Sequence, residues 1–424
     1  MTSNSVTQSQ APASTLQLAL WSHEPEQQDG DARQTNAVGL YDLAPRFVFA
    51  SGERGGEDRR DNAHVESVTR SFAYNGEPYV ITLDPARVMR RVRIDADEAG
   101  GTAKYKTMRI EALPGEREQV VEEVIRRLAT ERARLVLVDG DNRRNAKVQM
   151  RFSFYEIQKE LARVRRTLSI TEIKEALLIL SKTFLTIEQP ADHPGGSAML
   201  LQSTAFPVVA MRGGKGVSVR LDDDGEVGGN TETYLEFNPL VAKAIMSLKF
   251  QSISYEMLMK IRNPVSWWLY KSLSLHYHNS GDVEPMAIRA GDIITNSGMN
   301  RSKRHRDTLR AIKVAVEVLV TQGVLAGYEK ESERGTGPEI VDVTYALRPS
   351  EQFLEQIRRG KALAEQNARS LRQLAKPEDL DEQGRPRGPI PIDRTVESTL
   401  RRDRRNVLKQ GGTDASLIEA TAGR

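Results

Sequence analysis

The chain of 424 residues contains no cysteine, and aromatic residues make up only 6% of it. Without cysteine there are no disulfides, no thiolate ligands for zinc or iron–sulfur clusters, and no cysteine nucleophile. No apolar run approaches the length that crosses a bilayer, and residues 1–30 lack the basic-then-apolar pattern of a secretory signal. We therefore expect a cytoplasmic protein that does not enter a membrane.

The net charge is also small, because 61 Lys and Arg residues face 58 Asp and Glu residues, which gives +3. A protein that coats nucleic acid with its whole surface is usually more basic. Any affinity for DNA must therefore come from basic residues that gather locally. The length allows two or three domains with cores of their own.

The two ends of the chain have the composition of tails. Residues 1–60 are polar and bury too little apolar surface to offset chain entropy, so we predict a disordered N-terminal tail. Residues 61–150 are predicted to form an α/β region that precedes or extends the next domain. After residue 350 we predict a charged helix over 351–375 and a basic flexible tail over 376–424, which contains the basic cluster 401–405.

Residues 151–237 have the order of a winged helix. A helix is predicted over 152–161, and Ser169 with Glu172 forms a capping box that opens a second helix at 170–182. Ile173, Leu177 and Leu180 form one apolar face of that helix. Strands at 183–187, 198–211, 216–221 and 233–237 follow, with glycine-rich turns between them.

Residues 238–350 repeat this order. Asn238-Pro239 and Asn263-Pro264 each combine an N-cap with a first-turn proline. A short helix fits 288–295, a long helix fits 301–322, and strands at 324–328 and 340–347 form a hairpin. The sequence thus predicts an α+β fold with two tandem winged-helix domains between disordered tails.

The long helix carries the strongest signal for function. Leu309, Ile312 and Val316 define an apolar arc that faces the core, and His305 falls on the same arc as a packing residue. In the first half of the helix, the side opposite this arc is basic, as in a recognition helix that enters the major groove. The residues that we expect to contact DNA are Asn300, Arg301, Ser302, Lys303, Arg304, Arg306, Asp307 and Arg310.

Other basic residues give weaker signals. Lys330 and Arg334 on the second hairpin either contact phosphate or the minor groove, or form part of a solvated loop. Lys174, Arg212 and Lys215 are candidates for an auxiliary DNA contact in the first unit. Acidic neighbours make the helix 170–182 a poor base reader, so dimerisation or backbone contact is favoured there.

Two motifs that suggest catalysis do not support it. Gly213-Gly214-Lys215-Gly216 lacks the spacing and the hydroxyl of a P-loop. His276-Tyr277-His278 has the spacing of a nuclease metal pair, but it lies in a helical run, which separates the two imidazoles by about 200°. We expect no catalytic residue, no metal and no cofactor.

Tandem winged helices, in which the first unit is a poor base reader and the second has a basic recognition helix, resemble the iteron-binding plasmid replication initiators. The resemblance covers residues 150–350: Phe152–Ile187 resembles the first unit and Phe250–Leu347 the second. It implies that the second unit reads direct repeats in double-stranded DNA and that the first mediates dimerisation or a further contact. It also implies recruitment of a host initiator and helicase without ATP hydrolysis.

Two alternatives stay open at this point. A winged-helix transcriptional repressor shares the recognition helix, but it usually has one such unit plus a ligand-binding or dimerisation domain. A rolling-circle nicking enzyme requires the histidine pair to be a metal site.

Overall fold

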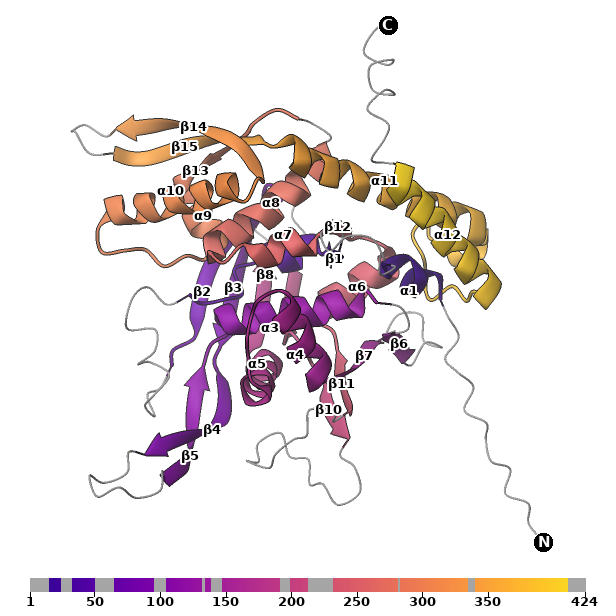
Figure 1. Ribbon diagram of the computed structural model, residues 1–424, viewed down its shortest axis with the longest axis horizontal. Coiled ribbons are helices and arrows are strands. Elements are labelled where there is room, and N and C mark those ends of the chain that lie inside the picture. The colour runs from indigo at the N-terminus through magenta and orange to yellow at the C-terminus, as the bar shows by residue number, and fades with distance from the viewer. Residues whose placement is uncertain are drawn as a thin grey trace, which may run out of the picture.

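The computed structural model describes residues 15–23, 33–49, 65–94, 104–131, 134–138, 147–190, 199–212, 232–280, 283–334 and 340–410. Helices and small antiparallel sheets alternate along this part of the chain (Figure 1). The predicted α+β class is therefore confirmed.

The first unit is a three-helix bundle with a hairpin. Its helices are α3 (Glu116–Ala129), α4 (Phe154–Arg163) and α5 (Ile170–Lys182), and its hairpin is β8 (Phe184–Gln189) with β9 (Met199–Ser203). Capping boxes at Ser153 and Ser169 start α4 and α5, as local sequence predicts for Ser169. Two further strands, β2 (Val68–Tyr74) and β3 (Glu77–Asp84), extend the hairpin into the sheet β2-β3-β8-β9.

The last strand predicted for the first unit belongs to another sheet. β11 (Glu232–Glu236) pairs with β7 (Lys147–Ser153) and β10 (Val209–Arg212), and β6 (Leu135–Val138) completes the order β10-β11-β7-β6. The reason is the matched burial of Leu235 opposite Met150 and of Thr233 opposite Phe152. The strand predicted over 216–221 lies outside the described residues.

The second unit has winged-helix topology. It consists of α8 (Pro264–Ser280), β13 (Met286–Arg289), α9 (Ala290–Ser297), α10 (His305–Thr321), β14 (Leu325–Arg334) and β15 (Ile340–Pro349), with sheet order β13-β15-β14. Two predicted helix starts are wrong. Ile288 and Arg289 belong to β13, which pairs with β15, and the long helix begins at His305 because residues 298–304 form a turn.

The prediction of disorder over 1–60 is wrong for residues 15–23 and 33–49. α1 (Leu16–Trp21) and α2 (Gly39–Leu43) form there, and β1 (Gln34–Ala37) pairs with β12 (Gln251–Ser254). Leu16, Leu20 and Tyr41 are at most 1% exposed. Average composition misses such short apolar clusters, which are buried against distant parts of the chain.

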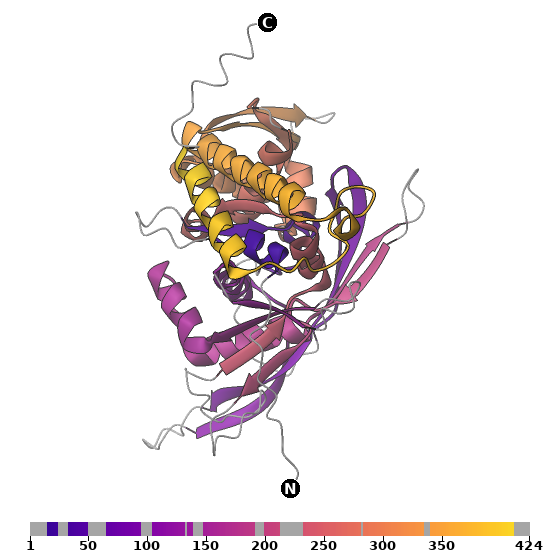
Figure 2. The same cartoon turned by 90° about the vertical axis from the view of Figure 1, so that its right-hand side faces the viewer.

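The C-terminal part is also ordered up to residue 410, contrary to the predicted flexible tail. α11 (Glu351–Leu374) is followed by α12 (Arg394–Gln410), which lies beside both α11 and α1 (Figure 2). Arg404, from the basic cluster, is 6% exposed and donates to the carbonyls of Ala19 (2.8 Å) and Ser22 (2.7 Å). It therefore satisfies carbonyls at the end of α1 that the helix leaves unpaired.

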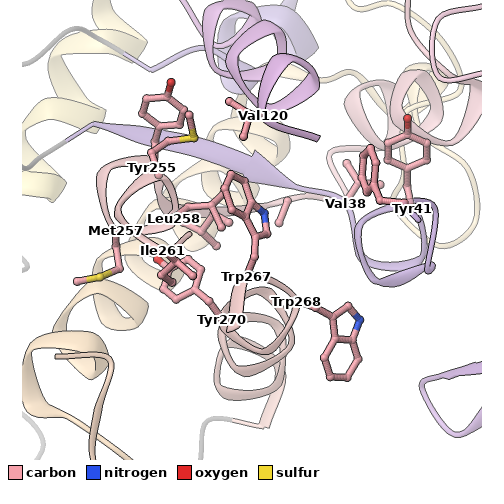
Figure 3. Close-up of a cluster of buried hydrophobic side chains, with 14 of the residues drawn as sticks. Val38, Tyr41, Val120, Tyr255, Met257, Leu258, Ile261, Trp267, Trp268 and Tyr270 are labelled. Atoms are coloured by element: carbon pink, nitrogen blue, oxygen red, sulfur yellow. The ribbon is translucent and has the colours of Figure 1, made fainter. Parts of the chain in front are cut away.

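One apolar core joins the two units. Figure 3 shows side chains from the segment 33–49, from α3, from α7 (Tyr255–Lys260) and from α8 gathered in one cluster. Trp267 and Trp268 are both buried, although two adjacent residues of a helix point to different faces. The segment 33–49 covers the second face, and Trp268 Nε1 donates to the carbonyl of Leu43 at 3.2 Å.

A buried group of charged side chains lies in the same region. This central ionic cluster consists of Asp42, Arg46, Glu122, Glu123, Arg126 and Lys271, and none exposes more than 7% of its side chain. Lys271 Nζ lies 2.8 Å from Asp42 Oδ1 and 2.7 Å from Glu123 Oε2. The cluster connects α2, α3 and α8, and with them the N-terminal segment and both units.

Candidate nucleic-acid interface

The turn that connects α9 to α10 has a fixed geometry. Gly298 ends α9 in the left-handed region with φ of 69°. A Cβ at this position would lie 2.6 Å from Arg70 Nη1 and 2.7 Å from Pro45 Cβ, so the position requires glycine. Farther along the turn, the backbone N–H of Ser302 donates to Thr308 Oγ1 at 2.9 Å, which ties the turn to the first residues of α10.

Residues outside the second unit support this turn. The side chain of Asn300 donates to the carbonyl of Phe49 at 2.5 Å, and Asn296 Oδ1 accepts from the backbone N–H of Ala73 in β2 at 2.9 Å. Arg70, also in β2, donates to the carbonyl of Phe47 at 2.7 Å. The position of the turn therefore depends on the N-terminal segment and on the sheet of the first unit.

α10 buries one face and exposes the other. Its buried residues are Thr308, Leu309, Ile312, Ala315, Val316 and Leu319, in agreement with the apolar arc predicted from sequence. Ser266 of α8 donates to the carbonyl of Ala315 at 2.8 Å and fixes the packing of the two helices. The opposite face of α10 is open to solvent.

The predicted DNA-contacting residues of this segment are all exposed, but they fall into two groups. Arg301, Ser302, Lys303 and Arg304 lie in the turn before the helix with Asn300, whereas Arg306, Asp307 and Arg310 lie on the first two turns of α10. The side chain of Arg306 is 76% exposed and only 3.9 Å from its neighbour Asp307. The basic surface is thus a turn followed by a helix start.

His305 does not pack in the core as we expected. It is exposed at the first position of α10, and its Nε2 lies 2.9 Å from the carbonyl oxygen of Val341 in β15. His305 still lies one helical turn before Leu309, but as the first residue of α10 it precedes the buried part of the arc, which begins at Thr308. The contact joins the start of α10 to the wing.

The wing presents its basic residues on the side of α10. Lys330 and Arg334 are exposed on β14 and alternate with three glutamates, so strand pleating places the two kinds of charge on opposite faces. Tyr328 shares the face of Lys330, and its hydroxyl lies 3.4 Å from Glu317 Oε1 of α10. On the other face, Glu329 pairs with Arg348 and Glu333 with Arg289.

Of the three auxiliary residues predicted in the first unit, only the side chain of Lys174 lies in the described part of the chain. Lys174 is half-buried on α5. The Lys215 position and the side chain of Arg212 lie outside the described residues. An auxiliary DNA contact by these three residues therefore stays a prediction.

The histidine pair lies on α8, as sequence predicts. His276 is exposed, His278 is half-buried, and Tyr277 between them is buried with its hydroxyl 2.8 Å from the carbonyl of Glu284. Burial and the nearby Lys361 lower the pKa of His278 to about 4. The helix directs the two imidazoles apart. Over the described part of the chain, no three His, Asp or Glu side chains group as metal ligands, and no helix is long and apolar enough to span a membrane.

These features define a winged-helix unit with an exposed basic turn and helix start. The sequence matches no protein-family profile. No curated protein matches it either. Among solved structures, domains 2 and 3 of RctB are similar with a TM-score of 0.40 and 10% identity, over 74% of this chain and 96% of that one.

A second structure of RctB domains 2–3 gives a TM-score of 0.36 and 9% identity over 69% of this chain and 95% of that one. The Pi initiator protein, solved in complex with iteron DNA, gives a TM-score of 0.34 and 11% identity over 56% of this chain and 91% of that one.

Proposed function

We propose that this chain is a plasmid replication initiator that binds repeated origin sites in double-stranded DNA and recruits host replication proteins. The observation that carries the proposal is the basic surface of the second unit. Its turn, the start of α10 and the inner face of the wing expose basic side chains next to one another, on a helix–strand–helix–helix–hairpin scaffold.

The geometry supports a division of tasks within this surface. Arg306 and Arg310 project from the first turns of α10, where side chains of a recognition helix reach base edges. Lys303 lies in the turn before the helix. A phosphate contact is favoured there because the DNA backbone runs along the edge of the major groove that the helix enters. Lys330 and Arg334 on the wing suit phosphates or the adjacent minor groove.

Initiation is favoured over repression by the presence of two winged-helix units in one body. A simple repressor pairs one reading unit with a ligand-binding or dimerisation domain, whereas the chain joins a second bundle to the reading unit through a shared core. Strand nicking is not part of the proposal, because His276 and His278 diverge on α8.

We further propose that the free protein is a dimer formed through the first unit. Leu200 is 62% exposed on β9, an edge strand of its sheet, and Val208 is 43% exposed nearby in sequence. An apolar side chain on an open strand edge suits pairing with a second copy. Sedimentation should show a dimer for the native chain and a monomer for Leu200→Glu, with Thr171→Glu, an exposed site on α5, as a matched control.

Selection of bound fragments from a random duplex pool tests the main proposal. We expect direct repeats to emerge, and permanganate to detect unpaired thymines beside them when the protein binds. Selection of a single inverted repeat without strand opening would favour a repressor instead. A pool that shows no sequence preference would contradict both readings of the surface.

A further inference from the structure

A two-stranded ribbon projects from the first unit. It consists of β4 (Ala86–Ile94) and β5 (Lys104–Ala112), which pair antiparallel along their whole length. The two strands contain seven Lys and Arg residues and one acidic residue, Glu111. In a chain with a net charge of +3, this is a strong local excess of positive charge.

The inner face of the ribbon covers α5. Ala86, Val88, Ile110 and Ala112 pack against Leu178 and Ile179, which lie on the side of α5 away from the bundle core. Arg90 Nε donates to Glu175 Oε2 at 3.1 Å at the start of the same helix. α5 occupies the position of a recognition helix in its unit, but the ribbon covers the face that a groove would receive.

The outer face of the ribbon is basic and open. Arg87 pairs across the strands with Glu111, and Met89 with Arg109, so all four residues share the face away from α5. Arg109 is exposed, and the side chain of Arg87 is 60% exposed. The Glu111 side chain is only 16% exposed, and it accepts from Arg87 and from the backbone N–H of Val65. Its negative charge is thus paired, and the face keeps a net positive charge from Arg87 and Arg109.

The ribbon lies on the same side of the molecule as the reading surface. Toward the left of Figure 1, the start of α10 and the wing occupy the upper half, and β4 and β5 extend below them. A DNA duplex seated on α10 and continued along this side meets the ribbon next. A two-stranded antiparallel ribbon also has dimensions that DNA grooves accept.

We infer that the outer face of the β4–β5 ribbon binds the phosphate backbone of the duplex, in place of the covered helix α5. The inference rests on the proposed DNA-binding function and assigns the first unit's contact to residues that sequence reasoning did not select. Because Arg87 and Arg109 contact phosphates, the contribution is independent of base sequence and sensitive to salt.

The test measures binding of the full-length chain to a random-sequence duplex across a series of salt concentrations. Arg109→Gln should weaken binding about fivefold to tenfold near 0.1 M salt and lower the salt slope by about 0.9. Arg87→Gln should act in the same direction. Arg151→Gln is the matched control, because Arg151 is an exposed strand arginine that pairs with Glu232 on the neighbouring strand of another sheet.

A shortened ribbon extends the test to the outer half. Replacing residues 91–107 by Asn-Gly joins Arg90 to its cross-strand partner Met108 through a two-residue turn and keeps the apolar base. Circular dichroism and thermal unfolding confirm that this variant folds. Its salt slope should fall further than that of Arg109→Gln.

The random duplex separates this inference from the proposed function. If both arginine variants bind the random duplex as Arg151→Gln does, the ribbon does not contact DNA, whatever the sequence preference of the chain. If they weaken only the preference for a selected site, the ribbon acts through α10 and the inference is also wrong. If the native chain lacks a preferred sequence, the proposed function fails, while the random-duplex measurement still decides the role of the ribbon.

Discussion

Asp42→Asn should destabilise the protein by about 3–5 kcal/mol, the typical cost of breaking a buried ion pair from one side. Asp42 accepts from Lys271 at 2.8 Å, from Arg126 at 2.5 Å and from the backbone N–H of Val38 at 2.6 Å. Asparagine keeps the shape but loses the charge. Even with its oxygen toward Arg126 and Lys271, its amide NH2 takes the place of Oδ2 and sets a donor against the backbone N–H of Val38. Glu123 then remains the only carboxylate paired with Lys271 in the central ionic cluster.

The pH dependence gives this prediction a second, independent part. Burial alone would raise the pKa of Asp42, but Arg126 and Lys271 outweigh it and hold the pKa well below its ordinary value. A carboxyl group with a depressed pKa stabilises the fold above its unfolded pKa of about 3.9, and this contribution is lost as the pH falls below that value. The native chain and Asp42→Asn should therefore differ most near pH 7 and converge in acid.

Urea unfolding followed by tryptophan fluorescence measures the effect. All three tryptophans, Trp21, Trp267 and Trp268, are buried in the core that surrounds the cluster, so the signal reports on this region. Asp292→Asn is the control, since Asp292 is exposed in the first turn of α9 and should change the unfolding free energy by less than about 1 kcal/mol. A loss below 1 kcal/mol for Asp42→Asn at pH 7, with an unchanged m-value, would refute the reasoning.

Three further predictions concern the reading surface and the histidines. Arg306→Ala should cost about 1–3 kcal/mol on a selected site if its side chain reads a base, whereas Lys303→Ala should weaken all duplexes alike; competition binding separates the two. The purified protein should not cleave DNA with magnesium or manganese, and His278→Ala should bind normally; a covalent tyrosine adduct on a gel would contradict this. Burial and Arg404 lower the pKa of His23 to about 3, although its hydrogen bond to Asn36 opposes the shift. The folded state is therefore more stable when His23 is neutral. The free energy of unfolding should fall by at most about 1.4 kcal/mol per pH unit between about pH 6.5 and pH 3. His23→Gln should reduce this dependence on pH when unfolding is measured across an acid titration.

Local signals in the sequence predicted local structure well. Ser169 with Glu172, Asn238 before Pro239, and Asn263 before Pro264 each cap a helix with the expected side-chain bond. These contacts join residues two or three positions apart, so the information lies within one turn of chain. The apolar arc of α10 was predictable for the same reason.

Contacts between distant residues left no such signal. Asp42 and Lys271 are 229 positions apart, and Arg404 reaches carbonyls more than 380 positions away. Charged residues are usually exposed, so nothing in their pattern predicted that these side chains are buried. The one available hint was α5, where Leu178 and Ile179 add a second apolar face and thereby indicate a partner such as the ribbon.

These long-range contacts also show that residue 237 is not a physical boundary. β12 and Trp268, from the second part of the chain, need β1 and the carbonyl of Leu43 from the first. The turn before α10 likewise needs Phe49 through Asn300. A fragment of residues 238–350 loses all of these partners, so weak DNA binding by that fragment would reflect a displaced turn as much as missing contacts.

Stability and DNA reading are nevertheless separable in the full-length chain. The central ionic cluster is buried, whereas the basic residues of the turn and of α10 are exposed, and the two groups share no member. Asp42→Asn should therefore leave DNA affinity unchanged wherever the folded state still dominates. DNA that binds only the folded state should in turn restore stability to this variant in proportion to the logarithm of its concentration. A variant that loses affinity while fully folded must instead have altered the turn, the wing or the ribbon.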